Sequence, residues 1–197
     1  MIDIFSRQQG LISPRSKNFA VVGCGGVGSW VALFLGMAVP DCHLYLFDHD
    51  VVEDTNLSRT PFKLSHIGQK KVVALAELLA ERRLSCTVTP YAEKVEDLSE
   101  YSLPPDTVVI DCRDVMSPPI PSAITGGYDG NSVTLHQRPD ASKIWGDAVG
   151  YTSPSWLAPP VFIAAMIVTA LCLDIELKED VAVTKNIKEV FDDYFKA

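Results

Sequence analysis

The chain alternates short runs of apolar or β-branched residues with longer segments of helical spacing, a pattern typical of an α/β protein. Strands are predicted at residues 19–22, 44–47, 85–89 and 107–110. Helices are predicted at residues 30–39, 65–81, 161–173 and 186–194. The run at 107–110 is apolar throughout, as expected for a central strand of a parallel sheet. The alternation favours a Rossmann-like, three-layer αβα fold with a mostly parallel central sheet.

The first predicted strand ends directly in a glycine-rich loop. Gly23, Gly25 and Gly28 have the spacing G-x-G-x-x-G, and Gly26 lies among them. Glycines permit a tight turn and a close backbone approach, and the free N–H groups of a helix start attract phosphate. Asp48 ends the second strand, about 20 residues further on, where an acidic side chain accepts hydrogen bonds from ribose hydroxyls. This arrangement predicts a nucleotide site without specifying the nucleotide.

Four further blocks resemble, in the same order, the ThiF, MoeB and HesA family, the bacterial relatives of the ubiquitin-activating E1 enzymes. Residues 48–59 are similar to the family's D-x-D-x-V-x-x-x-N-L-x-R, and residues 68–72 to its G-x-x-K-V. Residues 111–114 resemble D-C-x-D, and residues 5–8 resemble Y-S-R-Q. The resemblance covers residues 5 to about 114. It implies attack of a carboxylate on the α-phosphate of ATP, which gives an acyl adenylate and pyrophosphate.

The resemblance also implies a role for each matching residue of the ATP site. Asp48 would bind the ribose, and Asn56, Arg59 and Lys71 would bind the phosphates. Asp114 would hold Mg²⁺, a hard cation that prefers carboxylate and water ligands. The cofactor-binding loop would comprise Gly23, Gly25, Gly26 and Gly28, with Gly25 and Gly26 against the α-phosphate.

The residues expected to act in catalysis are Arg59, Lys71, Asp114 and Arg7. Arg7 lies on a predicted N-terminal arm that, by resemblance, reaches the phosphates of a neighbouring subunit. Several of these residues also have a purely structural interpretation. Arg7, Arg59 and Lys71 could be solvated surface charges, and Asp48 could cap the loop that follows its strand. Lys70 is read as solvated, and Asp111 as a structural hydrogen-bond acceptor.

Two departures from the family pattern concern cysteine. Many relatives carry a nucleophilic cysteine in the crossover segment, whereas residues 115–160 contain none, and the five cysteines are interpreted as reduced, inert residues. The paired C-x-x-C motifs of zinc-binding members are also missing, so no zinc is expected. Val115 replaces the Asn that often follows the metal aspartate in the family.

Length and composition indicate a single domain over residues 1–197, and the resemblance implies that it is a ThiF-type adenylation domain. We divide it into an N-terminal arm (1–17), a nucleotide-binding core (18–116), a partner-binding crossover rich in Pro and Gly with one strand at 132–136 (117–160), and C-terminal helices (161–197). The net charge of -8 argues against nucleic acid as the main partner. Because the N-terminus lacks a signal-peptide pattern and the run at 161–173 is too short for a bilayer, a cytoplasmic protein is expected, with no membrane partner.

These observations predict an E1-like adenylyltransferase, a homodimer, that activates the C-terminal carboxylate of a ubiquitin-like or sulfur-carrier protein. Without its own nucleophile it would leave the next step to a separate thiol-bearing acceptor protein. Three alternatives remain open. The segment 25–30 also resembles the tRNA-modifying dehydratases, which activate a carboxylate with ATP. The glycine loop with Asp48 is also typical of an NAD-dependent oxidoreductase. Val115 is consistent with a non-catalytic, nucleotide-binding member of the family.

Overall fold

The computed structural model describes residues 4–82, 85–113, 120–136, 154–176 and 183–195. Within these residues one seven-stranded sheet has the order β3-β2-β1-β4-β5-β6-β7. Its strands are β1 (Asn18–Val22), β2 (His43–Phe47), β3 (Thr87–Tyr91), β4 (Val108–Asp111), β5 (Ile124–Asp129), β6 (Ser132–His136) and β7 (Val183–Asn186). Neighbouring strands from β3 to β5 pair in parallel, and β6 and β7 pair antiparallel. The prediction of a Rossmann-like, mostly parallel α/β fold is confirmed.

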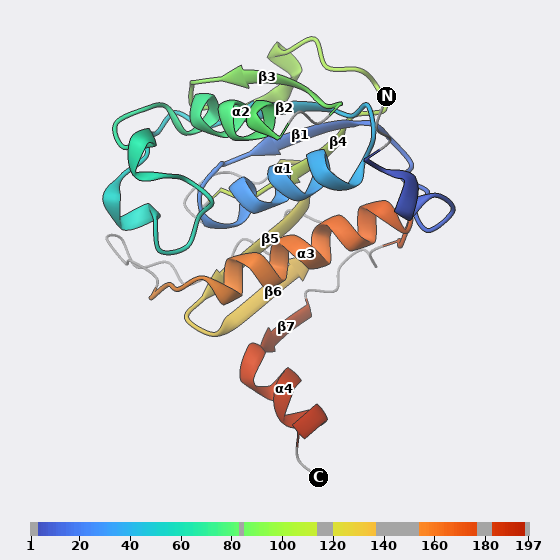
Figure 1. The fold of residues 1–197 in the computed structure, drawn as a ribbon, viewed down its shortest axis with the longest axis vertical. Coiled ribbons are helices and arrows are strands. Elements are labelled where there is room, and N and C mark those ends of the chain that lie inside the picture. The colour runs from blue at the N-terminus through green and yellow to red at the C-terminus, as the bar shows by residue number, and fades with distance from the viewer. Residues whose placement is uncertain (1–3, 83–84, 114–119, 137–153, 177–182, 196–197) are drawn as a thin grey trace.

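Three long helices lie on one face of the sheet (Figure 1). They are α1 (Gly26–Ala38), α2 (Lys71–Glu81) and α3 (Ala158–Cys172), and α4 (Ile187–Phe195) follows β7 at the C-terminal end. Four 3-10 turns complete the described elements: η1 (Ser6–Gln8), η2 (Asp54–Asn56), η3 (Leu64–His66) and η4 (Leu98–Glu100). None of the helices in the described ranges is long and apolar enough to cross a membrane.

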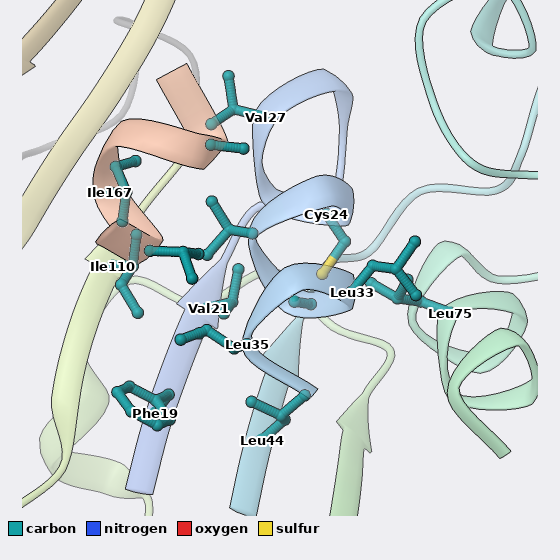
Figure 2. Packing of buried hydrophobic residues seen from close by; sticks show 14 of the residues in the cluster. Phe19, Val21, Cys24, Val27, Leu33, Leu35, Leu44, Leu75, Ile110 and Ile167 are labelled. Carbon is teal, nitrogen blue, oxygen red and sulfur yellow. The ribbon is translucent and has the colours of Figure 1, made fainter. Parts of the chain in front are cut away.

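Side chains of β1 alternate between two buried layers, as the period of two of a strand requires. Phe19 and Val21 point to the helices and pack with residues of α1, α2 and α3 (Figure 2). Ala20 and Val22 point to the opposite face, where residues 91–103 cover the sheet with Val95 in the core. Because β1 is covered on both faces, its carboxyl end and the glycine loop that follows it are fixed in place.

Two predicted elements differ in their bounds for local reasons. The helix predicted at 65–81 begins only at Lys71, because the residues before it hydrogen-bond to Val52. The N–H of Val52 donates to the carbonyl of Gln69 at 2.8 Å, and the N–H of Gly68 donates to the carbonyl of Val52 at 2.8 Å. The strand predicted at 85–89 lies at 87–91, in register with β2. These backbone bonds, to the acidic loop that follows β2 (residues 48–59) and to β2 itself, override the local sequence pattern.

The segment predicted as a crossover contains a β-hairpin. Strand β6 was predicted, but β5 and β7 were not. Strand β5 was missed since Gly126 and Gly127 have low strand propensity. The structure gives Gly126 a packing role, because an added Cβ would lie 2.6 Å from the Cδ1 atom of Ile167. Glycine thus lets α3 approach β5 closely. Residues 137–153 of the predicted crossover lie outside the described residues.

Candidate nucleotide site

The loop between β1 and α1 requires glycine at two positions. Gly23 has φ +85, and an added Cβ there would lie 2.9 Å from the carbonyl carbon and oxygen of Cys112. At Gly28 an added Cβ would lie 1.8 Å from the carbonyl oxygen of Gly23. Glycine at these positions therefore permits the tight turn and the close approach of α1 to the strand ends that the spacing predicted.

The start of α1 is open on one side and walled on the other. Gly25 is the N-cap residue, no side chain caps it, and nothing lies within 4 Å of a Cβ added there. A Cβ added at Gly26 would lie 2.7 Å from the hydroxyl oxygen of Tyr128. That hydroxyl also lies 2.8 Å from the Oγ of Ser155. The free space for an anion at this helix start therefore lies beside Gly25, and Tyr128 forms its wall.

Sequence reasoning did not identify Tyr128 as part of this site. It lies on β5, outside every block that resembles the family pattern, and only the sheet order brings it to the glycine loop. A strand placed beside β4 brings its residues to the same edge of the sheet as the end of β1. The sequence signal that was available was a single aromatic residue in a segment rich in glycine.

Asp48 joins the glycine loop to the acidic loop. It follows β2, is 9% exposed, and its Oδ2 accepts a hydrogen bond from the backbone N–H of Cys24 at 2.7 Å. Its Oδ1 accepts a second from the N–H of Asp50 at 2.8 Å. Each carboxylate oxygen has two lone pairs, so these bonds leave acceptor capacity at both oxygens. The capping role and the expected ribose contact are therefore compatible.

Lys71 is brought to the site by the acidic loop. Its Nζ lies 2.7 Å from the Oδ2 of Asp50, and its side chain is 11% exposed. The N–H of Lys71 also donates to the carbonyl of Asp50 at 3.1 Å, and the Nζ of Lys70 donates to the carbonyl of His49. These bonds fix the first turn of α2 against the loop that follows Asp48.

The pKa of Asp50 reflects this pairing. Partial burial acts to raise it, but the hydrogen bond and charge of Lys71, with smaller contributions from His49 and Lys70, lower the pKa below its ordinary value. Asp50 is therefore ionised at neutral pH. Asp48, His49 and Asp50 each offer a ligand atom, and these atoms lie within 4.8 Å of one another. Carboxylate oxygens of this kind suit Mg²⁺.

Asn56 and Arg59 lie at the end of the acidic loop. Asn56 is 8% exposed, and its Oδ1 accepts a hydrogen bond from the N–H of Glu53 at 3.1 Å. The Nη1 of Arg59 donates a hydrogen bond to the carbonyl of Thr55 at 2.6 Å. The carbonyl of Arg59 accepts from the Nε1 of Trp30 at 2.9 Å, which anchors the loop to α1. The guanidinium of Arg59 is only partly buried, and it carries five donors in total.

Arg7 lies at the other end of α1. It is exposed in η1, and its neighbour Gln8 donates a side-chain hydrogen bond to the carbonyl of Ala38, the last residue of α1. Because α1 has 13 residues, its two ends lie about 20 Å apart. Arg7 is therefore not brought to the glycine loop of its own chain. Asp114, the expected Mg²⁺ ligand, and Val115 lie outside the described residues.

Asp111 has the structural role that was expected for it. Its carboxylate makes a bidentate pair with Arg113, at 2.8 Å from Nε to Oδ1 and 2.8 Å from Nη2 to Oδ2. The Nη1 of Arg113 donates to the carbonyl of Val95 at 3.2 Å. Both side chains are nearly buried, at 9% and 12% exposure. This pair ties the end of β4 to the segment that covers the sheet.

The two cysteines near the glycine loop are unsuited to nucleophilic chemistry. Cys24 and Cys112 are free thiols. Burial is the main cause that raises the pKa of each thiol well above its ordinary value, with a further contribution from Asp48 for Cys24 and from Asp111 for Cys112. Both are therefore protonated at neutral pH, and a thiol is a poor nucleophile compared with a thiolate.

Among known protein families, the model of the ThiF family matches residues 3–118, which include the glycine loop, the acidic loop and α2. The chain belongs to the ThiF family. It is 30% identical over 106 residues to the adenylyltransferase and sulfurtransferase UBA4 of Yarrowia lipolytica. This match covers 53% of this chain and 26% of UBA4. It is 31% identical over 105 residues to the ATP-dependent ubiquitin transferase-like protein Cap2 of Enterobacter hormaechei, 50% of this chain and 17% of Cap2.

Solved structures resemble this chain over most of its length. E. coli MccB, in a crystal structure with ATP, has a TM-score of 0.67 and 17% identity, over 95% of this chain and 72% of MccB. At this identity the likeness shows a shared fold. The chain spans about a quarter of the length of UBA4.

Proposed function

We propose that this ThiF-family protein is an E1-like adenylyltransferase that binds Mg-ATP and activates a carboxylate as an acyl adenylate. The observation that carries the proposal is the junction at Asp48, which holds the open start of α1 and the Asp50–Lys71 pair in one site. The family membership and the names of UBA4 and its relatives support the same reaction. The description of MccB with ATP supports the nucleotide.

In the proposed reaction a carboxylate oxygen attacks the α-phosphorus of ATP, and the bond to the bridging oxygen of pyrophosphate breaks. Two anions must meet, and negative charge grows on the leaving group, so cations aimed at the phosphates lower the barrier. Lys71 and Arg59 are assigned this role, with Asn56 as a further phosphate contact. Asp48 is assigned to the ribose, and the loop from Gly23 to Gly28 to the α-phosphate.

Asp114 is assigned to Mg²⁺ on its position in the D-C-x-D block. The carboxylates of Asp48 and Asp50, with ligand atoms within 4.8 Å of one another, offer the donor chemistry that the ion prefers. When bound, the ion would neutralise charge on the phosphates. Within the chain, the Asp50–Lys71 pair would keep Lys71 extended towards the phosphates before the nucleotide binds.

The proposed substrate is the C-terminal carboxylate of a ubiquitin-like or sulfur-carrier protein. The name of Cap2, a ubiquitin transferase-like protein, and those of the UBA4 and MOCS3 sulfurtransferases support this class. Residues 115–160 contain no cysteine, so the acyl group would pass from the adenylate to a thiol on a separate acceptor protein.

We also propose a homodimer in which Arg7 serves the site of the second copy. The position of Arg7 supports this, because its neighbour Gln8 binds the end of α1 that lies about 20 Å from the glycine loop. We keep the division of the chain proposed from the sequence. In it, residues 1–17 form the arm and residues 117–160 form the segment that would bind the substrate protein.

The test is ATP–pyrophosphate exchange with a panel of purified ubiquitin-fold carrier proteins that end in Gly-Gly. We expect one carrier to support exchange that requires Mg²⁺ and is lost when its terminal glycine is deleted. Lys71→Ala and Asp114→Ala should abolish the exchange. Lys70→Ala is the matched control and should retain it, because the Nζ of Lys70 binds the carbonyl of His49 instead of Asp50.

Other outcomes would select among the alternatives. Exchange that is unchanged in Lys71→Ala would reject the site assignment. Binding of Mg-ATP without exchange for any carrier would favour a non-catalytic member. A tRNA band shift at low salt would favour the tRNA-modifying class, which the net charge of -8 argues against.

A further inference from the structure

Two cysteines lie side by side at the amino ends of β2 and β3, at the opposite edge of the sheet from the candidate nucleotide site. His43 pairs with Thr87 in the parallel register, so Cys42 and Cys86 occupy the preceding positions of adjacent strands. Residues paired in this way point to the same face of a sheet. The thiol of Cys42 also lies 3.9 Å from the carbonyl oxygen of Leu35. An interaction between the two thiols shifts the pKa values of both groups.

Three contacts on either side of the cysteines fix the two backbones together. The N–H of Asp41 donates to the Oγ of Ser85 at 3.1 Å, and the N–H of Thr87 donates to the carbonyl of Cys42 at 2.8 Å. The Nε2 of His43 lies 2.7 Å from the Oγ1 of Thr89. Neighbouring strands lie about 4.8 Å apart, within the range of Cα separations that a disulfide spans. A bond between the two sulfurs therefore requires little backbone movement.

We propose that Cys42 and Cys86 form a dithiol site that a low-molecular-weight disulfide, such as oxidised glutathione, converts reversibly to an intramolecular disulfide. Cys86 is partly exposed and can meet such a reagent, whereas Cys42, beside it on the adjacent strand, is 1% exposed. This inference is independent of the proposed adenylation.

The two thiols have complementary roles in the exchange. The thiolate of Cys86 attacks one sulfur of oxidised glutathione, which forms a mixed disulfide and releases one glutathione thiolate. Cys42 then loses its proton and attacks the sulfur of Cys86, which releases the second glutathione. The protein loses two protons and two electrons, and one oxidised glutathione becomes two reduced molecules.

The electrostatics agree with this order of events. The hydrogen bond from Cys42 lowers the pKa of the Cys86 thiol to about 7, although partial burial opposes it. The same hydrogen bond and burial raise the pKa of Cys42. Cys86 is therefore the attacking thiolate near neutral pH. Once Cys86 has formed the mixed disulfide it is no longer a thiolate, so the interaction that raises the pKa of Cys42 is lost and Cys42 can ionise and resolve the mixed disulfide.

The cross-link would close a loop that contains Asp48, Asn56, Arg59 and Lys71 of the proposed ATP site. Residues 42–86 include β2, the acidic loop and α2, and β3 is the edge strand of the sheet. Closing such a loop restricts the unfolded chain, so oxidation should raise the Tm on the order of 5 °C or more. The bond would lie at the amino ends of the strands and leave the carboxyl edge unaltered.

The experiment treats the folded protein with oxidised glutathione, blocks remaining thiols with N-ethylmaleimide after unfolding, and maps the peptides. We expect a Cys42–Cys86 cross-link, a loss of two hydrogen atoms from the intact mass, and a higher Tm that reduction reverses. Cys24 and Cys172, which are buried, should be recovered as blocked thiols. So should Cys112, which is partly exposed but has a thiol pKa raised well above its ordinary value. A link between any other pair, or glutathione that stays on Cys86 of the unmodified sequence, would overturn the proposal.

Two variants separate the roles of the cysteines. Cys42→Ala should retain glutathione on Cys86 and show no rise in Tm, and its reaction should shift to higher pH because the hydrogen bond that stabilises the thiolate is lost. Cys86→Ala, a change at a partly exposed position, should react with no glutathione. Equal reaction of Cys86→Ala and the unmodified sequence would contradict the assignment of Cys86 as the attacking thiol.

Discussion

At the scale of single residues, the glycine loop separates the demands of folding from those of binding. Gly28 lies where any side chain would collide with the carbonyl of Gly23, whereas the space beside Gly25 is open. The two positions belong to one sequence motif, yet only the structure distinguishes what each one does. The loop therefore offers a matched pair of substitutions.

We predict that Gly28→Ala lowers the free energy of unfolding by about 3 kcal/mol or more, because the added Cβ would require α1 to move. Gly25→Ala should change it by less than about 1 kcal/mol. Its methyl group would instead occupy the space beside the helix start and weaken Mg-ATP binding about tenfold. Urea unfolding and calorimetric titration measure the two effects. Unaltered Mg-ATP binding in Gly25→Ala would place the phosphates elsewhere.

Much of the candidate site was predictable at this scale because its chemistry depends on local spacing. The glycine loop and Asp48 lie at the ends of consecutive parallel strands, and the structure brings them into direct contact. The partner of Lys71 was not predictable, because Asp50 lies 21 residues away and the motif assigns it no clear role. Tyr128 was missed for the same reason, since its place depends on the sheet order.

At the scale of elements, the Asp111–Arg113 pair holds β4 to the segment that covers the sheet. It is nearly buried, and Arg113 reaches the carbonyl of Val95 in that segment. A buried pair adds little net stability over apolar residues, but removal of one partner leaves a charge without compensation. The pair therefore matters chiefly as a link between elements.

We expect Arg113→Ala to lower the free energy of unfolding by about 3 kcal/mol, because Asp111 would keep a buried charge without its partner. The double variant Asp111→Asn with Arg113→Met should lose less than the single variant. Urea unfolding of the double variant and of the single variants Asp111→Asn and Arg113→Met completes a double-mutant cycle. A loss below about 1 kcal/mol in Arg113→Ala would show that the link is dispensable.

The bounds of elements were harder to predict than their existence. Strands β1, β2 and β4 and helices α1 and α3 follow from apolar runs, which burial on both faces of the sheet produces. The start of α2 did not follow, because tertiary hydrogen bonds between Val52 and residues 68–69 compete with the helix. Strand β5 was missed because Gly126 is selected there for the approach of Ile167.

At the scale of the whole molecule, the parallel sheet separates two kinds of chemistry. Its carboxyl edge carries the glycine loop, Asp48 and the acidic loop, where ligands of open α/β sheets bind. Its amino edge carries the Cys42–Cys86 pair. A modification at the amino edge would therefore alter stability without direct contact with the nucleotide.

The central claim is that the junction at Asp48 forms a Mg-ATP site in which Lys71 contacts the phosphates. Calorimetric titration of the unmodified chain, Lys71→Ala and Lys70→Ala with Mg-ATP, and separately with NAD, tests it most directly. We predict that Mg-ATP binds, that Lys71→Ala weakens binding at least about tenfold, and that Lys70→Ala changes it less than about twofold. Binding of NAD in place of Mg-ATP, or equal affinities of the two lysine variants, would contradict this account.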